Sequence, residues 1–121
     1  APAQLQLKDS RGDHALIWAA FKGHTSIAMQ LCEHPAGKVL LTQQNIEGRN
    51  ALMHAAQSGN QNMVDLLLGN PSGFQQLIAR DKENRNAPMI AAFYGHHELA
   101  DHMTKIWYQT MSLIRAGIQN G

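Results

Sequence analysis

The side chains in this sequence that could perform chemistry are its seven histidines and its one cysteine. The densest group of histidines is His96, His97 and His102. A zinc site needs ligands that converge in tetrahedral geometry. On a helix, the adjacent His96 and His97 point in different directions, and His97 and His102 are five residues apart instead of three or four. The spacing therefore predicts no metal site and no metal cofactor.

Catalytic motifs are also missing from the sequence. It contains no glycine-rich phosphate loop, no nucleophile elbow and no pair of carboxylates at the end of a strand. Cys32 lies on the apolar stripe of a predicted helix, so we expect it to be buried and unreactive. The sequence therefore predicts a protein that is not an enzyme and needs no cofactor.

The overall composition narrows the class of partner. The net charge is +1 at pH 7, so the chain has no broad basic surface, and we expect neither nucleic acid nor an anionic membrane as its main partner. Apolar runs are far shorter than the roughly 20 residues that cross a bilayer, so we expect no membrane insertion. A lone cysteine fits a reducing compartment, and we expect the cytoplasm.

The sequence repeats itself, and the repeat predicts the helices that would position any functional side chain. Gly23, Gly59 and Gly95 are each separated by 36 residues, and so are the pairs Ala19-Ala20, Ala55-Ala56 and Ala91-Ala92. A constant period of about 20 to 50 residues indicates a stacked array of similar units. We expect a single all-α domain over residues 1–121, with units at about 9–44, 45–80 and 81–116. Residues 1–8 would be a lead-in, and residues 117–121 a tail or the start of a further unit.

The middle unit predicts two short helices joined by a glycine. Asn50 can accept hydrogen bonds from the free amides of a helix over residues 51–58, and Gly59 can end that helix. An apolar stripe predicts a second helix over residues 61–68. Neither helix reaches the ~12–15 residues that an isolated helix needs in water, so neighbouring units must hold both. The stripe consists of Met63, Val64, Leu67 and Leu68.

The connection between units predicts a further short helical turn. Asn70 and Pro71 have the residue types of a helix cap followed by a first-turn proline. Leu41, Leu77 and Ile78 would hold these turns against the array. The third unit lacks such a break, so its second helix is predicted over residues 97–115. Its extended apolar face would serve as a terminal cap or contact sequence outside this chain, and it comprises Trp107, Met111 and Ile114.

Three segments of the sequence resemble the ankyrin repeat. They are DSRGDHALIWAAFKGHTSIAMQLC (9–32), NIEGRNALMHAAQSGNQNMVDLLL (45–68) and DKENRNAPMIAAFYGHHELADHMT (81–104). The family's pattern runs D-x-x-G-x-T-P-L-H-x-A-A-x-x-G-H-x-x-I-V-x-x-L-L. Ile17, Met53 and Met89 replace the first histidine of that pattern, so apolar packing should replace its hydrogen bonds. The resemblance implies an ankyrin-repeat solenoid of stacked helix-turn-helix units with short turn tips.

The same resemblance implies a concave face that binds a protein. It is formed by the turn tips and the exposed sides of the first helices, and its aromatic and arginine residues match the types that dominate binding hot spots. Alternatively, the aromatics pack between repeats and the charges are merely solvated. Trp18, His54 and Ile90 lie one helical step further in and are expected in the core. The expected partner-binding residues are Arg11, Asp13, Phe21, Lys22, Glu47, Arg49, Gln57, Ser58, Glu83, Arg85, Phe93 and Tyr94.

The sequence supports two functions. The first is a protein–protein interaction module, a scaffold or adaptor whose partner is another protein. The alternative is a regulatory or targeting segment of a larger enzyme, channel or secreted bacterial or protist effector. In the effector case the host cytosol would be the compartment, and the last helix would contact other parts of the parent chain.

Overall fold

The computed structural model describes residues 8–120, with the side chains of residues 8–117. All regular structure in this part of the chain is helical, so the expected all-α class is confirmed. The expected packing of Leu5 in the lead-in falls outside the described residues. The elements are α1 (Ala15–Lys22), α2 (Thr25–Glu33), α3 (Pro35–Lys38), the 3₁₀ turn η2 (Val39–Leu41), α4 (Ala51–Ser58), α5 (Gln61–Leu68), α6 (Gly73–Ile78), α7 (Ala87–Phe93) and α8 (His97–Asn120).

Helices α1, α4 and α7 each begin at a side-chain cap. Asn50 Oδ1 accepts a hydrogen bond from the Met53 amide at 2.9 Å, and Asn86 does the same for Met89 at 3.0 Å. His14 occupies the equivalent place in α1, where its Nδ1 accepts from the Ile17 amide at 3.3 Å. The longer distance indicates that histidine caps this helix less well than asparagine caps the other two.

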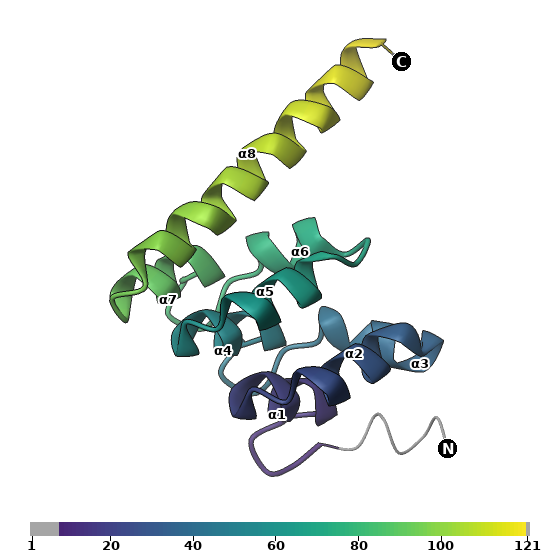
Figure 1. The fold of residues 1–121 in the computed structure, drawn as a ribbon, viewed down its shortest axis with the longest axis vertical. Coiled ribbons are helices and arrows are strands. Elements are labelled where there is room, and N and C mark those ends of the chain that lie inside the picture. Colours follow the sequence, from purple (N-terminus) through teal and green to yellow (C-terminus); the bar gives the residue numbers. More distant parts are fainter. Residues whose placement is uncertain (1–7, 121) are drawn as a thin grey trace.

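These three helices stack directly on one another. Helix α1 packs against α4, and α4 against α7, while α2 packs against α5 (Figure 1). Alanine pairs lie between the layers, where their small side chains allow close approach; Ala20, Ala55, Ala56 and Ala91 are fully buried. The middle layer is the most enclosed, because residues 51–56 of α4 are all buried. We call α1, α4 and α7 the inner helices.

The connections between units contain the expected helical turns, but the prediction that Asn70 caps the start of such a turn is wrong. Asn70 does not begin α6; its Nδ2 donates to the Leu66 and Leu67 carbonyls at 3.1 Å each and so closes α5. Helix α6 begins at Gly73 instead. The expected cap and proline occur in the first unit, where His34 Nδ1 accepts from the Ala36 amide at 3.1 Å and Pro35 follows it.

The apolar residues of these turns divide between core and surface. Leu41 and Leu77 are buried as expected. Ile78, expected to be buried with them, is 46% exposed because it lies at the last position of α6, turned away from the stack.

Helix α8 extends beyond the rest of the molecule. It runs to Asn120, five residues past the predicted end, so residues 117–120 belong to this helix (Figure 1). Its first part packs against α7 and α6. The expected apolar face is only partly buried: Trp107 and Met111 are half-buried, whereas Ile114 is exposed. The far part of the helix thus has no packing partner within the described chain.

Candidate protein-binding surface

The turn tips that precede the inner helices share one local structure. In each, the side-chain oxygen of the first residue accepts hydrogen bonds from the backbone amides two and four positions later. Asp9 Oδ1 accepts from Arg11 and Asp13, and the equivalent atoms of Asn45 and Asp81 repeat the pattern, all at 2.9 Å. None of these three residues was predicted to have this role, although their 36-residue spacing is visible in the sequence.

Backbone hydrogen bonds join each tip to the next. The Ile46 amide donates to the Arg11 carbonyl at 3.0 Å, and the Lys82 amide donates to the Glu47 carbonyl at 2.9 Å. The tips at residues 9–13, 45–49 and 81–85 therefore form a continuous row. This row and the exposed sides of the inner helices are called the tip face below.

The three arginines expected on this face are all engaged within the chain. Arg11 pairs with Glu47 at 3.0 Å, and both side chains are more than half exposed. Arg49 and Arg85 both approach Asp81 Oδ2, at 3.8 and 3.3 Å, and their side chains are only 12% and 20% exposed. The exposed Glu83 is a further partner of Arg85, at 3.1 Å. The expected row exists, but two of its members are largely covered.

Two tip carboxylates have lowered pKa values. For Asp9 the main cause is the hydrogen bond from the Asp13 amide. For Asp81, burial acts to raise the pKa, but the Arg85 and Glu83 amides and the Arg85 charge together lower it. Both groups are therefore ionised at neutral pH and hold the tips in shape.

Asp13, expected as an exposed contact residue, is buried. Only 8% of it is exposed, because its carboxylate turns inward and accepts a hydrogen bond from Asn45 Nδ2 at 2.8 Å. At the equivalent position, Arg49 and Arg85 reach outward over the inner helices. The Arg49 guanidinium donates to Gln57 Oε1, and that of Arg85 lies 5.6 Å from the Phe93 ring centroid.

The aromatic residues expected on the tip face are exposed. Phe21 is 51% exposed, Phe93 70% and Tyr94 44%. The alternative that the aromatics pack between repeats applies in part to Phe21, whose ring also contacts His54 of the next unit. Phe93 and Tyr94 form an edge-to-face pair with centroids 5.2 Å apart. Among the other expected contact residues, Lys22 and Ser58 are exposed and Gln57 is half-buried.

The residues placed one helical step further in do not all belong to the core. His54 and Ile90 are buried as expected, but Trp18 is 45% exposed. Its indole Nε1 donates to Asp9 Oδ2 at 3.0 Å, which fixes the ring at the edge of the first tip. The same position is covered in the second and third units because a preceding inner helix packs there.

A pocket opens beside Trp18 on the tip face. Its volume is about 280 Å³, and we call it the Trp18 pocket. Three rings line the pocket. The centroid of the Phe21 ring lies 6.4 Å from that of Trp18 and 5.9 Å from that of His54. Lys22 Nζ lies 5.5 Å from the centroids of both Trp18 and Phe21. The lining residues are Arg11, Asp13, Ile17, Trp18, Phe21, Lys22 and His54.

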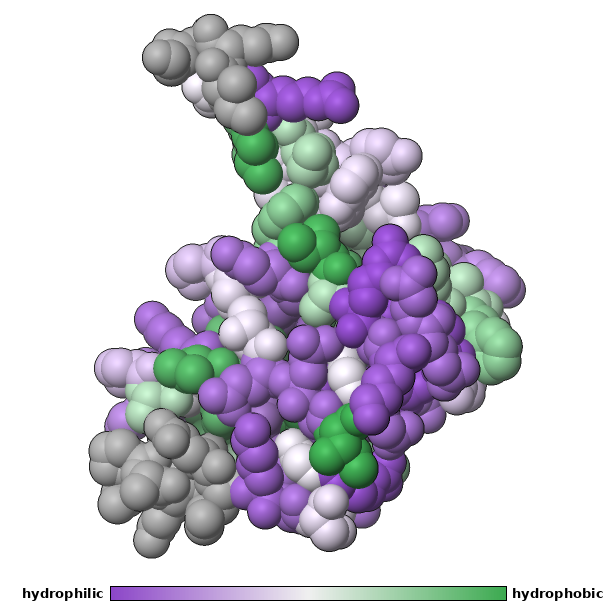
Figure 2. All heavy atoms as spheres, turned by 180° about the vertical axis from the view of Figure 1, so that it is seen from behind, coloured by the Kyte–Doolittle hydropathy of each residue, from purple (hydrophilic) through white to green (hydrophobic). Residues whose placement is uncertain are grey.

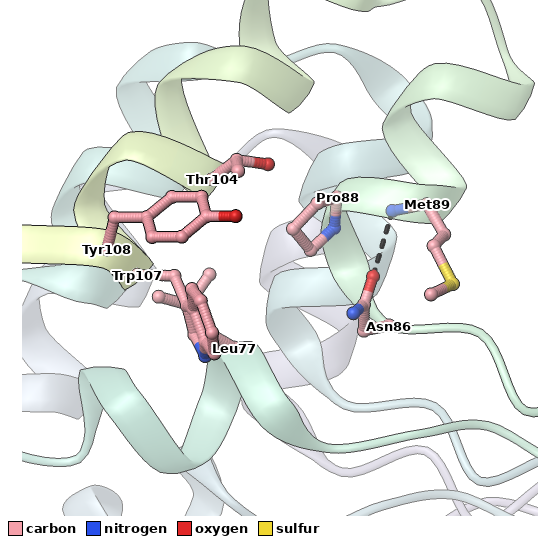
Figure 3. A pocket seen from close by; sticks show the side chains of 7 residues that line it. All are labelled: Leu77, Asn86, Pro88, Met89, Thr104, Trp107 and Tyr108. Carbon is pink, nitrogen blue, oxygen red and sulfur yellow. Dashed lines mark hydrogen bonds between the residues drawn. The ribbon is translucent and has the colours of Figure 1, made fainter. Parts of the chain in front are cut away.

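A second pocket lies at the other end of the stack, between α7 and α8. Its volume is about 270 Å³. Tyr108 and Thr104 of α8 face Pro88 of α7 across the opening, and Trp107 lies beside Leu77 (Figure 3). Asn86 borders this pocket, but its side chain is already used as the cap of α7.

The described residues show no group of three or more side chains suited to a metal ion, and none of their helices is long and apolar enough to cross a membrane. Cys32 is buried as expected, and this burial raises the pKa of its thiol. The face shown in Figure 2 is mainly hydrophilic, with separate hydrophobic spots instead of one broad apolar patch.

Comparison with known protein families identifies the repeat. A family model described as ankyrin repeats, in three copies, matches residues 1–76. The chain belongs to the ankyrin repeat family. The matched residues end within α6, and α7 stacks on α4 beyond them as the next ankyrin layer would. No curated protein matches the chain. Ankyrin repeats are generally protein–protein interaction modules, and the family is typically non-enzymatic.

Proposed function

We propose that this protein is an interaction module, a scaffold or adaptor that binds a protein partner on the tip face. The observation that carries the proposal is the exposed pair Phe93 and Tyr94, beside the half-buried Arg85. Large aromatic side chains that project from a rigid element contribute strongly to binding, because little entropy is lost when they are covered. The inner helices supply that rigid element.

The exposure and the number of the expected contact residues support a protein–protein interaction of modest affinity. Asp13 is buried and Arg49 and Arg85 are largely covered, and the other expected contact residues are half-buried or exposed and within reach of a partner. A standard interface uses about 20 to 30 residues on each side, so the described surface would supply only part of one. We therefore infer a modest affinity for the described part of the chain.

The proposal is tested by replacing the aromatic pair. Phe93→Ala with Tyr94→Ala should abolish capture of a partner, measured by quantitative pull-down with chemical cross-linking, because the exposed rings are lost while α7 keeps its N-terminal cap Asn86. Met29→Ala with Gln30→Ala is the matched control, since both residues are exposed on α2, outside the tip face. Equal capture by the two double variants would reject the tip face as the binding surface. Circular dichroism should show unchanged helicity in both.

A second proposal concerns the projecting part of α8. Leu113 is 74% exposed, Tyr108 62% and Ile114 40%, so this part of the helix presents several large apolar side chains to solvent. This favours the alternative that the repeats are a regulatory or targeting segment of a larger enzyme, channel or effector, whose other parts would contact α8. The sequence of the parent gene on both sides of this chain tests that idea directly.

A further inference from the structure

We propose that the Trp18 pocket binds an arginine side chain from an exposed segment of the protein partner. The inference rests on the proposed function, because it names the chemistry that the tip face would recognise. Its first support comes from a comparison of the pocket with the same place in the other two units.

In the second and third units, the chain's own arginines cover the equivalent place. Asp13, Arg49 and Arg85 occupy one repeat position, and Phe21, Gln57 and Phe93 occupy another. The Arg49 side chain crosses from its tip to Gln57, and the Arg85 guanidinium lies over Phe93. In the first unit the shorter Asp13 turns inward to Asn45, so this position supplies no side chain that crosses from the tip to Phe21. The pocket is the space left by an arginine that this unit lacks.

The polar groups of the pocket suit the missing guanidinium. Asp13 is one of the lining residues, and its Oδ1 already accepts from Asn45, which leaves Oδ2 to accept from a guest. Charge-assisted hydrogen bonds from a guanidinium to a carboxylate are about twice as strong as neutral ones. His54 is only 7% exposed, and its Nε2 has no hydrogen-bond partner among the described residues. Burial, with the nearby Arg49 charge, lowers the pKa of His54, so its neutral ring can accept a hydrogen bond.

The apolar walls suit the planar shape of the same group. Trp18 and Phe21 offer ring surfaces on which a guanidinium can stack, as Arg85 does on Phe93. A volume of about 280 Å³ is just below the range of roughly 300–1,000 Å³ typical of sites for whole small molecules. The pocket therefore fits one side chain of a larger partner.

Two cations border the pocket and define the competing possibility. Arg11 is already paired with Glu47, but Lys22 lies over both rings, where a guest cation would stack. If Lys22 instead recruits an acidic side chain, the pocket would prefer glutamate. The preference of the wild-type chain for an arginine or a glutamate guest separates the two cases. Removing the Lys22 charge should then raise the affinity for arginine and lower that for glutamate.

The test uses blocked pentapeptides with one central residue between alanines, titrated into the ¹⁵N-labelled full chain. The central residue is arginine, its neutral analogue citrulline, or glutamate. We expect the arginine peptide to shift the signals of the Trp18 indole and the Phe21 amide, with an affinity about tenfold higher than that of the other two peptides. No shift at these signals, or stronger binding of glutamate, would overturn the proposal.

Substitutions in the chain make the test specific. Asp13→Arg with Asn45→Asp rebuilds the Arg49 and Asp81 arrangement in the first unit, so it should fill the pocket from within and reduce binding about tenfold. Asp13→Asn keeps the hydrogen bond with Asn45 and removes only the negative charge. It should therefore lower the affinity for the arginine peptide and leave that for the citrulline peptide unchanged. Lys22→Gln should raise the affinity for the arginine peptide, because it removes a competing positive charge. A lower affinity in that variant contradicts the proposal.

The peptide test and the capture test can fail separately. If no arginine peptide binds while Phe93→Ala with Tyr94→Ala still abolishes partner capture, the interaction function stands and the arginine pocket is rejected. If the arginine peptide binds as expected while no tip-face substitution affects partner capture, the pocket stands and the proposed function is rejected.

Discussion

At the residue scale, two buried histidines show how single side chains link stability to pH. His14 is fully buried as the cap of α1, and His54 is buried against Phe21. Desolvation is the main reason that the pKa of each lies below its ordinary value of 6.5. Both rings are therefore neutral in the folded protein near pH 7, whereas the unfolded chain binds protons more readily as the pH falls below 6.5.

This difference predicts a loss of stability on mild acidification. Because the unfolded state binds more protons in this range, the free energy of unfolding should be greatest above pH 6.5 and should fall between pH 6.5 and 5. Urea unfolding at pH 7, 6 and 5 measures it. His14→Asn keeps a capping oxygen like that of Asn50 and cannot be protonated, so its pH dependence should be smaller. The carboxylates of Asp9 and Asp81 do not confuse the result, since their pKa values lie below 3.8.

A wild-type chain that is as stable at pH 5 as at pH 7 would contradict this account of the two histidines. So would an unchanged pH dependence in both His14→Asn and a matching His54→Asn variant. The second variant is needed because either ring alone accounts for only part of the expected effect.

At the element scale, the glycines that separate each inner helix from the outer helix after it (α2, α5 or α8) differ in what surrounds them. Gly59 and Gly95 occupy the same repeat position after equivalent helices, with φ of 72° and 86°. A Cβ at Gly59 would lie 2.5 Å from the His96 ring, whereas a Cβ at Gly95 would meet no atom within 4 Å. His96 lies there because its Nε2 is 3.1 Å from the Gln57 carbonyl, a contact that joins the third unit to the second.

Alanine substitutions at these glycines separate backbone strain from crowding. Gly95→Ala should cost only the strain of a left-handed residue, about 1–2 kcal/mol. Gly59→Ala should cost more, because the His96 ring must also move and its contact with Gln57 weakens. Urea unfolding measures both variants. In the double variant Gly59→Ala with His96→Ala, the extra loss of stability caused by crowding should largely disappear. Equal destabilisation by Gly59→Ala and Gly95→Ala would instead show that the His96 ring moves aside without cost.

The elements themselves were largely predictable from the sequence, and the exceptions have identifiable physical causes. Caps, glycine breaks and apolar stripes are local patterns, so the sequence predicted the inner and outer helices well. Asp13 was placed wrongly because its partner, Asn45, lies 32 residues away. Trp18 was placed in the core because it shares the repeat position of His54 and Ile90, one helical step inside the tip face. Periodicity does not reveal that no described helix covers this position in the first unit.

At the whole-molecule scale, stacked repeats behave as a nearly linear array in which each unit is stabilised mainly by its neighbours. The middle layer is covered on both sides, and its inner helix is the most completely buried. The third layer is covered on one side only: Met89 is 44% exposed, whereas Met53 at the same position of the middle unit is fully buried. Helix α8 partly compensates, because Ile106 and Trp107 pack against the core.

This arrangement divides α8 into a structural and a projecting part, which two truncations should distinguish. Removing residues 112–121 deletes mostly exposed helix, so the free energy of unfolding should change by no more than about 0.5 kcal/mol. Removing residues 106–121 also deletes Ile106 and Trp107 and uncovers Leu77, which should cost about 3 kcal/mol or more. Urea unfolding of the three chains measures both effects. A large loss from the shorter truncation would show that the projecting part stabilises the stack, and it would remove the argument that its apolar side chains are free for a partner.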